Sequence, residues 1–341
     1  MRKIKVLIVD DSLIFREVLA RGISSDPTIE VVAKAVDPFD ARDRILEYGP
    51  DVMTCDIEMP KMNGIEFIKR LLPQYPLPVV VVSSVSVAVF DALKAGAVDF
   101  VTKPNVQSVQ DVEEFINELI QKIKIAAKAK ITKHSGPSLT NMVKEGTFVE
   151  GRLIAFGAST GGTEAVFNIL KVLPSQIPGI VVTQHIPPIF SKMFADRLNE
   201  STQLRVKEAQ TGDYVDPGSV LIAPGGQHMR LKKVGERYRV ECFEGEKVNG
   251  HCPSIDVLFE SVAKEVGDGA IGIILTGMGY DGAKGLLAMR RKGARTLGQD
   301  ERSSVVYGMP KVALEIGAVE KQMPLEMMAQ ALLTLLRRKN G

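Results

Sequence analysis

The feature that most constrains this chain is an alternation of short, β-branched apolar runs with amphipathic, helix-like segments. In the first 120 residues the apolar runs are 6–9, 31–33, 52–53, 79–82 and 100–101, and the helix-like segments are 12–25, 38–48, 64–72, 87–96 and 107–125. Short buried strands that alternate with helices are typical of βαβ units and of a parallel sheet. The pattern therefore predicts an α/β domain with five parallel strands.

A change in composition after Lys122 predicts where this domain ends. Lysines recur up to Lys133, the segment His-Ser-Gly-Pro-Ser (134–138) follows, and apolar periodicity returns only near Phe148. Such a stretch is typical of a basic helix end followed by a linker. We predict domains over residues 1–122 and 151–341, joined by a linker over 123–150. A chain of 341 residues is long enough for about two domains.

The same alternation resumes from Gly151. The expected strands are 153–156, 180–183, 220–223 and 271–276, and the expected helices are 163–172, 190–199, 255–266 and 282–291. Residues 230–234 and 238–243 flank a short turn and predict a β-hairpin. We therefore expect a second α/β domain, with a doubly wound, mostly parallel sheet and a β-hairpin.

Composition excludes several classes of protein. The 43 basic and 41 acidic residues give a net charge of only +2, which argues against a nucleic-acid-binding surface. Three cysteines without a C-x-x-C pair exclude a disulfide scaffold and argue against a zinc site. We therefore expect a reducing compartment, the cytoplasm. Because no apolar stretch approaches the roughly 20 residues that a membrane span needs, we expect no membrane insertion.

Polar side chains follow several strands of the predicted N-terminal sheet. Asp10 and Asp11 follow the first strand, Asp56 the third, Ser83 the fourth and Lys103 the fifth. Carboxyl ends of parallel strands meet at one edge of a sheet. Each residue alone could be an ordinary polar loop residue, but together the carboxylates predict a Mg²⁺ site. A hydroxyl and an ammonium beside it suit phosphoryl transfer, in which negative charge develops.

The strings that carry these residues resemble the receiver domain of two-component response regulators. They are Val-Asp-Asp-Ser (9–12), Asp-Ile-Glu-Met-Pro (56–60), Ser-Ser (83–84) and Thr-Lys-Pro (102–104). The resemblance implies a flavodoxin-like fold and phosphorylation of Asp56 by a histidine kinase. It implies Mg²⁺ held by Asp11, Asp56 and the backbone carbonyl of Glu58, with Asp10 assisting. It also implies that Ser83 and Phe100 form the switch pair beside Lys103.

A glycine-rich turn in the second domain holds a candidate nucleophile. The string Gly-Ala-Ser-Thr-Gly-Gly-Thr (157–163) lies between a predicted strand and helix, and it satisfies the G-x-S-x-G pattern of nucleophilic serines. A serine there would lie near backbone N–H groups that can stabilise an oxyanion. The same turn could bind a nucleotide phosphate, although it contains neither G-x-G-x-x-G nor a P-loop lysine. The motif alone leaves both interpretations open.

Two further residues favour an esterase. A nucleophilic serine needs a base and an orienting acid. His185 ends the next predicted strand and Asp281 follows a later one, whereas His134 lies in the linker and His228 and His251 lie in loops. Taken singly, His185 could be a packed histidine and Asp281 a helix N-cap. The chain order serine, histidine, acid differs from that of α/β-hydrolases, so we expect another family.

The strings of this domain resemble the catalytic domain of chemotaxis protein-glutamate methylesterases. They are Gly-Ala-Ser-Thr-Gly-Gly-Thr-Glu (157–164), Thr-Gln-His (183–185), Ala-Pro-Gly (223–225), Pro-Ser-Ile-Asp (253–256), Leu-Thr-Gly-Met-Gly (275–279) and Gly-Met-Pro (308–310). The resemblance implies hydrolysis of glutamate methyl esters on chemoreceptors, deamidation of receptor glutamines, and no cofactor for the hydrolysis. It implies a triad of Ser159, His185 and Asp281, and an oxyanion site formed by the backbone amides near Thr160 and Met278.

The fusion predicts regulation: we expect the unphosphorylated receiver to inhibit the esterase and phosphorylation of Asp56 to relieve that inhibition. Three other output domains are conceivable. A DNA-binding domain would need a helix-turn-helix, which the strand–helix alternation does not favour. A nucleotide-binding domain would use the 157–162 turn, and a non-catalytic domain would only bind receptors.

Overall fold

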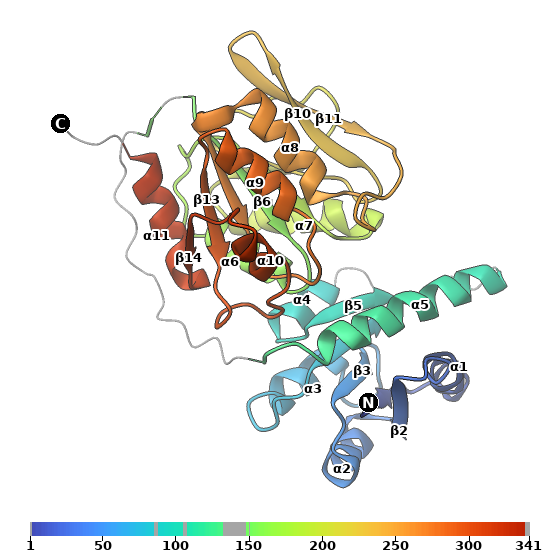
Figure 1. Ribbon diagram of the computed structural model, residues 1–341. Coiled ribbons are helices and arrows are strands. Elements are labelled where there is room, and N and C mark those ends of the chain that lie inside the picture. Colours follow the sequence, from blue (N-terminus) through green and yellow to red (C-terminus); the bar gives the residue numbers. More distant parts are fainter. Residues whose placement is uncertain (1, 85–87, 105–107, 132–147, 150, 338–341) are drawn as a thin grey trace. The chain divides into compact units, whose positions relative to one another are not determined.

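The computed structural model describes the whole chain except residues 1, 85–87, 105–107, 132–147, 150 and 338–341. The chain divides into two compact units, Met1–Lys133 and His134–Gly341 (Figure 1). Most of the predicted linker over 123–150 lies outside the described residues, so the predicted domain boundaries remain predictions.

The N-terminal unit is built on one parallel sheet of five strands in the order β2-β1-β3-β4-β5. Its strands are β1 (Ile4–Val9), β2 (Ile29–Ala35), β3 (Val52–Asp56), β4 (Val79–Ser83) and β5 (Asp99–Thr102). This is the flavodoxin-like order, in which the chain reverses direction across the sheet between β1 and β3. All five predicted strands are confirmed.

In the described part of this unit, five helices cover the sheet. They are α1 (Leu13–Ile23), α2 (Pro38–Tyr48), α3 (Gly64–Leu71), α4 (Ala88–Lys94) and α5 (Val109–Ala126). Local signals explain their bounds: Asp37 caps α2 by accepting from the N–H groups of Phe39 and Asp40, and Gly49 ends it with a positive φ of 54°. A capping box joins Ser108 and Asp111 at the start of α5.

The C-terminal unit contains a seven-stranded sheet in the order β14-β13-β12-β6-β7-β9-β8, and every pairing in it is parallel. Its strands are β6 (Leu153–Ala158), β7 (Ile180–Gln184), β8 (Arg205–Glu208), β9 (Ser219–Ile222), β12 (Ala270–Ile274), β13 (Arg295–Gln299) and β14 (Lys321–Met323). From β6 the chain adds β7, β8 and β9 on one side of that strand, and it later adds β12, β13 and β14 on the other side. The point of reversal therefore lies between β6 and β12, where such sheets bind ligands.

Helices and a separate hairpin complete this unit. The helices are α6 (Gly162–Leu170), α7 (Pro188–Ser201), α8 (Ile255–Glu265), α9 (Ala283–Arg291), α10 (Met309–Glu315) and α11 (Leu325–Leu336), with a short 3₁₀ turn at Gly267–Gly269. The hairpin pairs β10 (His228–Val234) with β11 (Arg237–Phe243) in antiparallel register, as predicted. The doubly wound α/β fold is thus confirmed.

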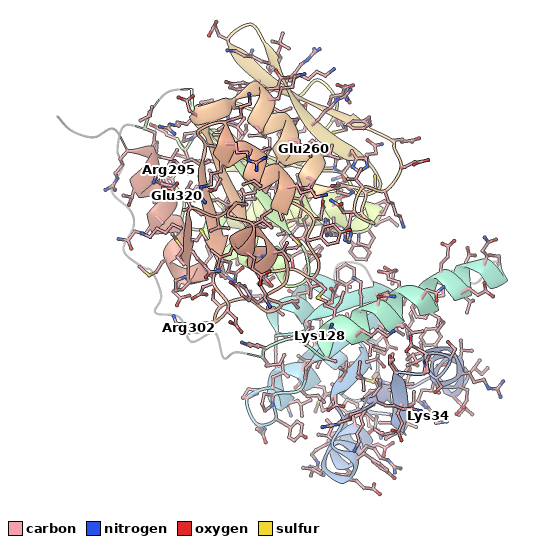
Figure 2. All side chains as sticks on the ribbon, in the orientation of Figure 1. Lys34, Lys128, Glu260, Arg295, Arg302 and Glu320 are labelled. Atoms are coloured by element: carbon pink, nitrogen blue, oxygen red, sulfur yellow. The ribbon has the colours of Figure 1, made fainter. Side chains whose placement is uncertain are left out.

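The sequence analysis did not predict the strands β8, β13 and β14 or the helices α10 and α11. β8 is an edge strand of sequence Arg-Val-Lys-Glu, and β14 is only three residues long, so neither carries a clear apolar run. Arg295, the first residue of β13, forms an ion pair with Glu320, the residue just before β14 (Figure 2). Its Nε and one terminal guanidinium nitrogen each donate to a different oxygen of the Glu320 carboxylate at 2.6 Å. This bidentate ion pair helps to fix a register that apolar patterning does not specify.

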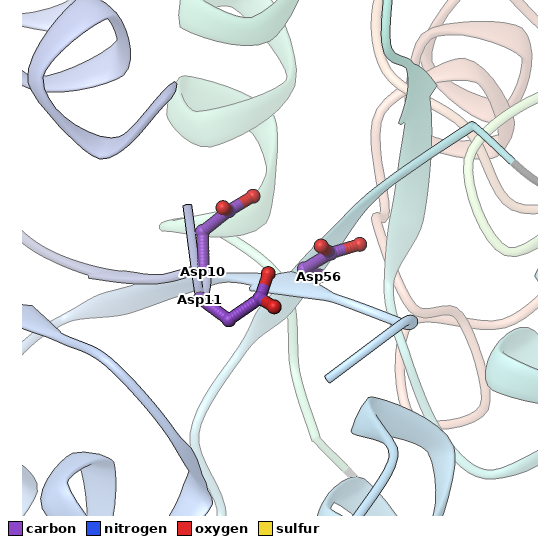
Figure 3. Close-up of side chains that lie close together, drawn as sticks. All are labelled: Asp10, Asp11 and Asp56. Carbon is purple, nitrogen blue, oxygen red and sulfur yellow. The ribbon is translucent and has the colours of Figure 1, made fainter. Parts of the chain in front are cut away.

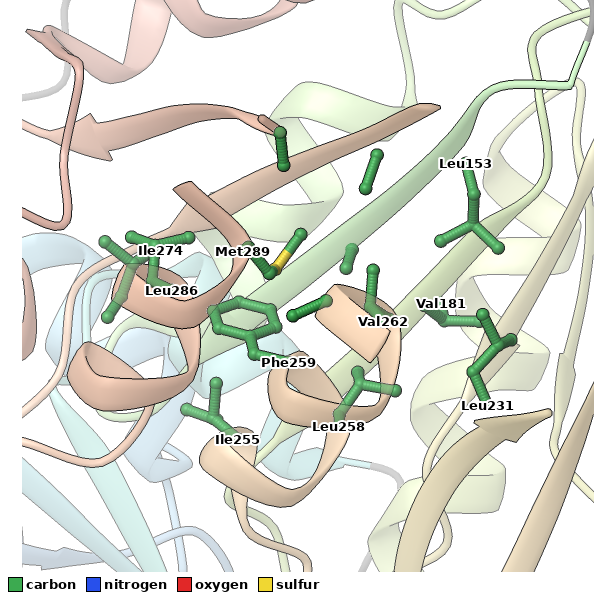
Figure 4. Close-up of a cluster of buried hydrophobic side chains, with 14 of the residues drawn as sticks. Leu153, Val181, Leu231, Ile255, Leu258, Phe259, Val262, Ile274, Leu286 and Met289 are labelled. Atoms are coloured by element: carbon green, nitrogen blue, oxygen red, sulfur yellow. The ribbon is translucent and has the colours of Figure 1, made fainter. Parts of the chain in front are cut away.

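The core of the C-terminal unit lies between the sheet and the pair α8 and α9. Phe259 and Val262 of α8 meet Leu286 and Met289 of α9 over the central strands, and all four side chains are buried (Figure 4). Gly157 is required at this contact, because a Cβ there would lie 2.3 Å from the Ile255 side chain. Among the described residues, no helix is both long and apolar enough to cross a bilayer.

Candidate active site and acidic pocket

Ser159 lies in the tight turn that joins β6 to α6. Its N–H donates to the Thr276 carbonyl at 3.0 Å, and its own carbonyl accepts from the Gly162 N–H at 2.7 Å. Gly161 completes the turn with a φ of 77°, a conformation that side chains disfavour, and a Cβ there would lie 2.7 Å from Val305. The turn therefore holds Ser159 at the carboxyl edge of the sheet, half-buried.

His185 directly follows β7 and links Ser159 to Asp281. Its Nδ1 lies 3.2 Å from Ser159 Oγ, and its Nε2 lies 2.8 Å from Asp281 Oδ2. An ionised carboxylate only accepts hydrogen bonds, so the proton belongs on Nε2, which leaves Nδ1 to accept from the serine hydroxyl. The two ring nitrogens are thus used the opposite way round from the serine-protease arrangement. The geometry is that of a nucleophile, a base and an orienting acid.

The Asp281 carboxylate is buried and accepts five hydrogen bonds. Besides His185, the donors are Asn249 Nδ2, Ser254 Oγ and the backbone N–H groups of Ile255 and Asp256, at 2.7 to 3.3 Å. Burial alone would raise the pKa of Asp281, but the hydrogen bonds from His185 and Asn249 outweigh it and hold the pKa below its ordinary range. Asp281 therefore stays ionised beside His185.

Asp281 caps a different helix from the one that follows it in sequence. Gly282, with a φ of 86°, precedes α9, and no side-chain cap is present there. Asp281 instead accepts from the first N–H groups of α8, where the helix dipole favours a negative charge. Asp281 therefore both caps the start of α8 and contacts His185.

The other described histidines have different surroundings. The ring of His251 stacks on that of His185, with centroids 3.6 Å apart and planes inclined by 11°. Burial, helped by the proximity of His185, lowers the pKa of His251 to about 4, so it is neutral near pH 7. His228 is buried, with Nδ1 accepting from the Ser254 N–H and Nε2 facing the Glu246 carbonyl. His134 lies outside the described residues.

The loop after β12 is fixed beside Ser159 by several hydrogen bonds. The Gly277 carbonyl accepts from the N–H groups of Gly308 and Met309, and the Gly277 N–H donates to the Val306 carbonyl. The Thr276 hydroxyl donates to the Thr160 carbonyl at 3.0 Å. In the described part of the chain, the Met278 N–H donates to no backbone carbonyl. This hydrogen-bonded loop is where the sequence resemblance predicts an oxyanion site.

The sequence analysis assigned no role to four residues that support this site: Asn249, Ser254, Asp256 and Gln299. Gln299 is fully buried, and its Oε1 accepts from the Thr276 N–H at 2.8 Å. Only Asn249 carries a local signal, because Asn-Gly is the preferred pair of a tight hairpin turn. Ser254 and Asp256 belong to the string 253–256 that carries the family resemblance, but the string alone does not say what they contact, and Gln299 resembles an ordinary strand residue.

The structure brings three carboxylates of the N-terminal unit together. One oxygen from each of Asp10, Asp11 and Asp56 lies within 4.8 Å of the others (Figure 3). Lys103 Nζ lies 2.7 Å from both Asp10 Oδ2 and Asp56 Oδ2. Burial raises the pKa of Asp56, although Lys103 opposes that effect. Clustered carboxylate oxygens around one point are the donors that Mg²⁺ prefers, so these residues fit a magnesium ion.

The remaining predicted residues of this unit lie near the pocket. Ser83 is buried at the end of β4, and the Lys103 N–H donates to its carbonyl at 3.0 Å. Phe100 is buried on β5, paired in register with Val81 of β4. The Glu58 side chain is exposed and accepts from Ser84 Oγ at 3.0 Å.

Comparison with known proteins identifies the family. The model of the CheB methylesterase family matches residues 154–332, and that of the response regulator receiver domain matches residues 6–117. The chain belongs to the CheB methylesterase family. Both resemblances that the sequence motifs suggested are confirmed, and the chain is an ester hydrolase with a receiver domain.

Relatives of this CheB methylesterase match along nearly its whole length. The protein-glutamate methylesterase/protein-glutamine glutaminase 2 of Syntrophomonas wolfei is 59% identical over 336 residues, 98% of each chain. The Escherichia coli K12 protein-glutamate methylesterase/protein-glutamine glutaminase is 46% identical over 338 residues, covering 98% of this chain and 97% of that one. The crystal structure of the Thermotoga maritima CheB methylesterase catalytic domain is 36% identical, with a TM-score of 0.54, and covers 55% of this chain and all of that one.

Proposed function

We propose that this chain hydrolyses γ-methyl esters of glutamate on chemoreceptors, deamidates receptor glutamines, and is activated by phosphorylation of Asp56. The observation that carries the hydrolytic part is the line of hydrogen bonds from Ser159 Oγ through His185 to Asp281. The substrate class is supported by the names of relatives that match along almost the whole chain.

In the proposed reaction, His185 Nδ1 takes the hydroxyl proton as Ser159 Oγ attacks the ester carbonyl. Asp281 stabilises the imidazolium that forms, because its carboxylate accepts from Nε2. The backbone amides of Thr160 and Met278 bind the oxyanion. The ester C–O bond then breaks, and methanol leaves with the proton from His185. Water, deprotonated by His185, hydrolyses the acyl-enzyme and restores Ser159.

Deamidation would use the same groups. The glutamine side-chain carbonyl would take the place of the ester carbonyl, and ammonia would leave in place of methanol. Both reactions give the same glutamyl acyl-enzyme, so a single oxyanion site and a single base suffice. No metal or organic cofactor enters this scheme.

The proposed phosphoacceptor is Asp56, with a histidine kinase as phosphodonor. Asp10, Asp11, Asp56 and the Glu58 carbonyl would hold Mg²⁺, which neutralises the charge of the transferred phosphoryl group. Lys103 already pairs with the Asp56 carboxylate and can pair with a phosphoryl group there. Ser83 and Phe100 would form the switch pair.

In this proposal the unphosphorylated receiver inhibits the esterase, and phosphorylation of Asp56 relieves the inhibition. The added charge is the local event that such switches use. We propose the cytoplasm as the location. The three cysteines are free thiols, which suits a reducing compartment.

A methanol-release assay on methylated chemoreceptor tests the hydrolytic function. We expect release by the full chain and none above background by Ser159→Ala. Ser201→Ala is the matched control, because it makes the same change at an exposed position at the end of α7. Release by Ser159→Ala at the rate of the unmodified chain would overturn the proposal.

A further inference from the structure

A four-residue turn reaches the catalytic residues from outside the strands that carry them. Val248 and His251 exchange backbone hydrogen bonds, each of 3.0 Å, around the central pair Asn249 and Gly250. Both central residues have positive φ, 53° and 84°. This is the pattern of a type I′ turn, for which Asn-Gly is the favoured sequence. These two backbone hydrogen bonds close the turn without using the Asn249 side chain.

The side-chain amide of Asn249 contacts two carboxyl groups outside the turn. Its single amide nitrogen donates one hydrogen to Asp281 Oδ1 at 2.7 Å and the other to Asp256 Oδ2 at 2.8 Å. Both carboxylates are buried. The amide thus uses both of its N–H groups to bridge two buried acids of like charge.

The two oxygens of Asp281 have separate partners. Oδ1 accepts from Asn249, Ser254 Oγ and the Asp256 N–H, whereas Oδ2 accepts from His185 Nε2 and the Ile255 N–H. Asn249 is therefore one of the donors that anchor Oδ1 and set the rotation of the carboxylate. That rotation decides where Oδ2 meets the histidine.

Asp256, the second acceptor of the Asn249 amide, is itself held by a backbone hydrogen bond. Its Oδ1 accepts from the Gly285 N–H at 2.6 Å, near the start of α9. Asn249 is thus held between α8, which carries Asp256, and the loop that carries Asp281. The same turn also stacks the His251 ring on His185.

We propose that Asn249 is a positioning residue for the hydrolysis, fixing the Asp281 carboxylate so that its Oδ2 holds His185 in line with Ser159. The inference rests on the roles proposed above for those three residues. It adds a fourth member, acting through Asp281 and touching no substrate. Its contribution belongs to the reaction step and not to binding of the receptor.

Two variants separate the amide from the turn. Asn249→Gly keeps a residue suited to positive φ but removes both donors, and Asn249→Asp keeps the size but replaces the donors with acceptors beside two carboxylates. We expect kcat to fall by about ten- to a hundredfold in each, most in Asn249→Asp, because small displacements of reacting groups are costly. KM for methylated receptor should stay within about twofold.

Gly250→Asn is the matched control. A Cβ at Gly250 meets nothing within 4 Å, asparagine tolerates the positive φ, and the Asn249 amide is retained. Its kcat should equal that of the unmodified chain. Thermal unfolding of all variants identifies any loss that reflects unfolding, and rates are compared where each variant is folded.

The outcomes are distinguishable. A wild-type kcat in Asn249→Asp, or a loss that appears in KM alone, would overturn the positioning role. Activity in Ser159→Ala, measured in the same assay, would overturn the proposed triad instead, whatever the Asn249 variants do.

Discussion

Gly277 lies against Ser159 so closely that a Cβ on Gly277 would be 2.6 Å from the serine Cβ. The contact joins the loop after β12 to the turn after β6, and it leaves no room for any side chain. It explains why the loop that is expected to bind the oxyanion can lie directly beside the proposed nucleophile.

We expect Gly277→Ala to lower kcat for methanol release by about a hundredfold, because the new methyl group must displace Ser159 or shift the loop that carries Gly277. The same methyl group would lie 2.5 Å from Met309 Sδ, so a lower melting temperature should accompany the loss. Steady-state kinetics and thermal unfolding check both effects. A folded Gly277→Ala enzyme with unchanged kcat would contradict the close packing.

Asp281→Asn should lower kcat by about two to four orders of magnitude, because an amide can present a donor to His185 and favour the wrong tautomer. The measurement is methanol release at saturating receptor. Asp196→Asn is the control, since Asp196 is an exposed acid paired only with Lys192 among the described residues. Equal losses in the two variants would argue against a special role for Asp281.

Asp56→Asn should abolish activation by a small phosphodonor with Mg²⁺, because the amide is not a phosphoacceptor. The ratio of methanol release with and without phosphodonor is the measurement. Asp43→Asn, at an exposed position on α2, should keep the full ratio. A normal activation ratio in Asp56→Asn would place the phosphoacceptor elsewhere.

His251 should make the C-terminal unit less stable in mild acid. Its folded-state pKa of about 4 lies below the ordinary value of 6.5, so between these pH values the unfolded chain binds the extra proton. Stability therefore rises with pH across this window, by at most about 1.4 kcal/mol per pH unit for one proton. Denaturant unfolding from pH 4 to pH 7 should give a shallower slope for His251→Phe. Identical slopes would show that His251 is not the group responsible.

Much of the fold is predictable because the buried strands of a parallel sheet appear in the sequence as continuous apolar runs. Val79–Ser83 is buried along its whole length, and the sequence pattern identified it. Within the described residues, Arg205–Glu208 pairs with a neighbour on one side only, and it carries three charged residues, so its pairing depends on the rest of the sheet. Local sequence cannot supply that information.

The residues of the candidate site also divide into those that the sequence pattern could place and those that it could not. Ser159, His185 and Asp281 each follow a strand, so topology alone brought them to one edge. Asn249 is not at a strand end, and its contact with Asp281 spans 32 residues of sequence. A turn motif predicts the backbone of such a residue but not the carboxylates that its side chain will meet.

The residues of the proposed triad follow β6, β7 and β12, and this has a consequence for synthesis of the protein. His185 and Asp281 are 96 residues apart, and β12 must insert beside β6 before they can meet. A ribosome needs roughly 5 to 20 s to add that length of chain. Throughout that interval the nascent polypeptide carries its serine and its histidine without their acid. If the proposed triad is the catalytic one, hydrolytic activity therefore arises late in synthesis, once β12 has paired with β6.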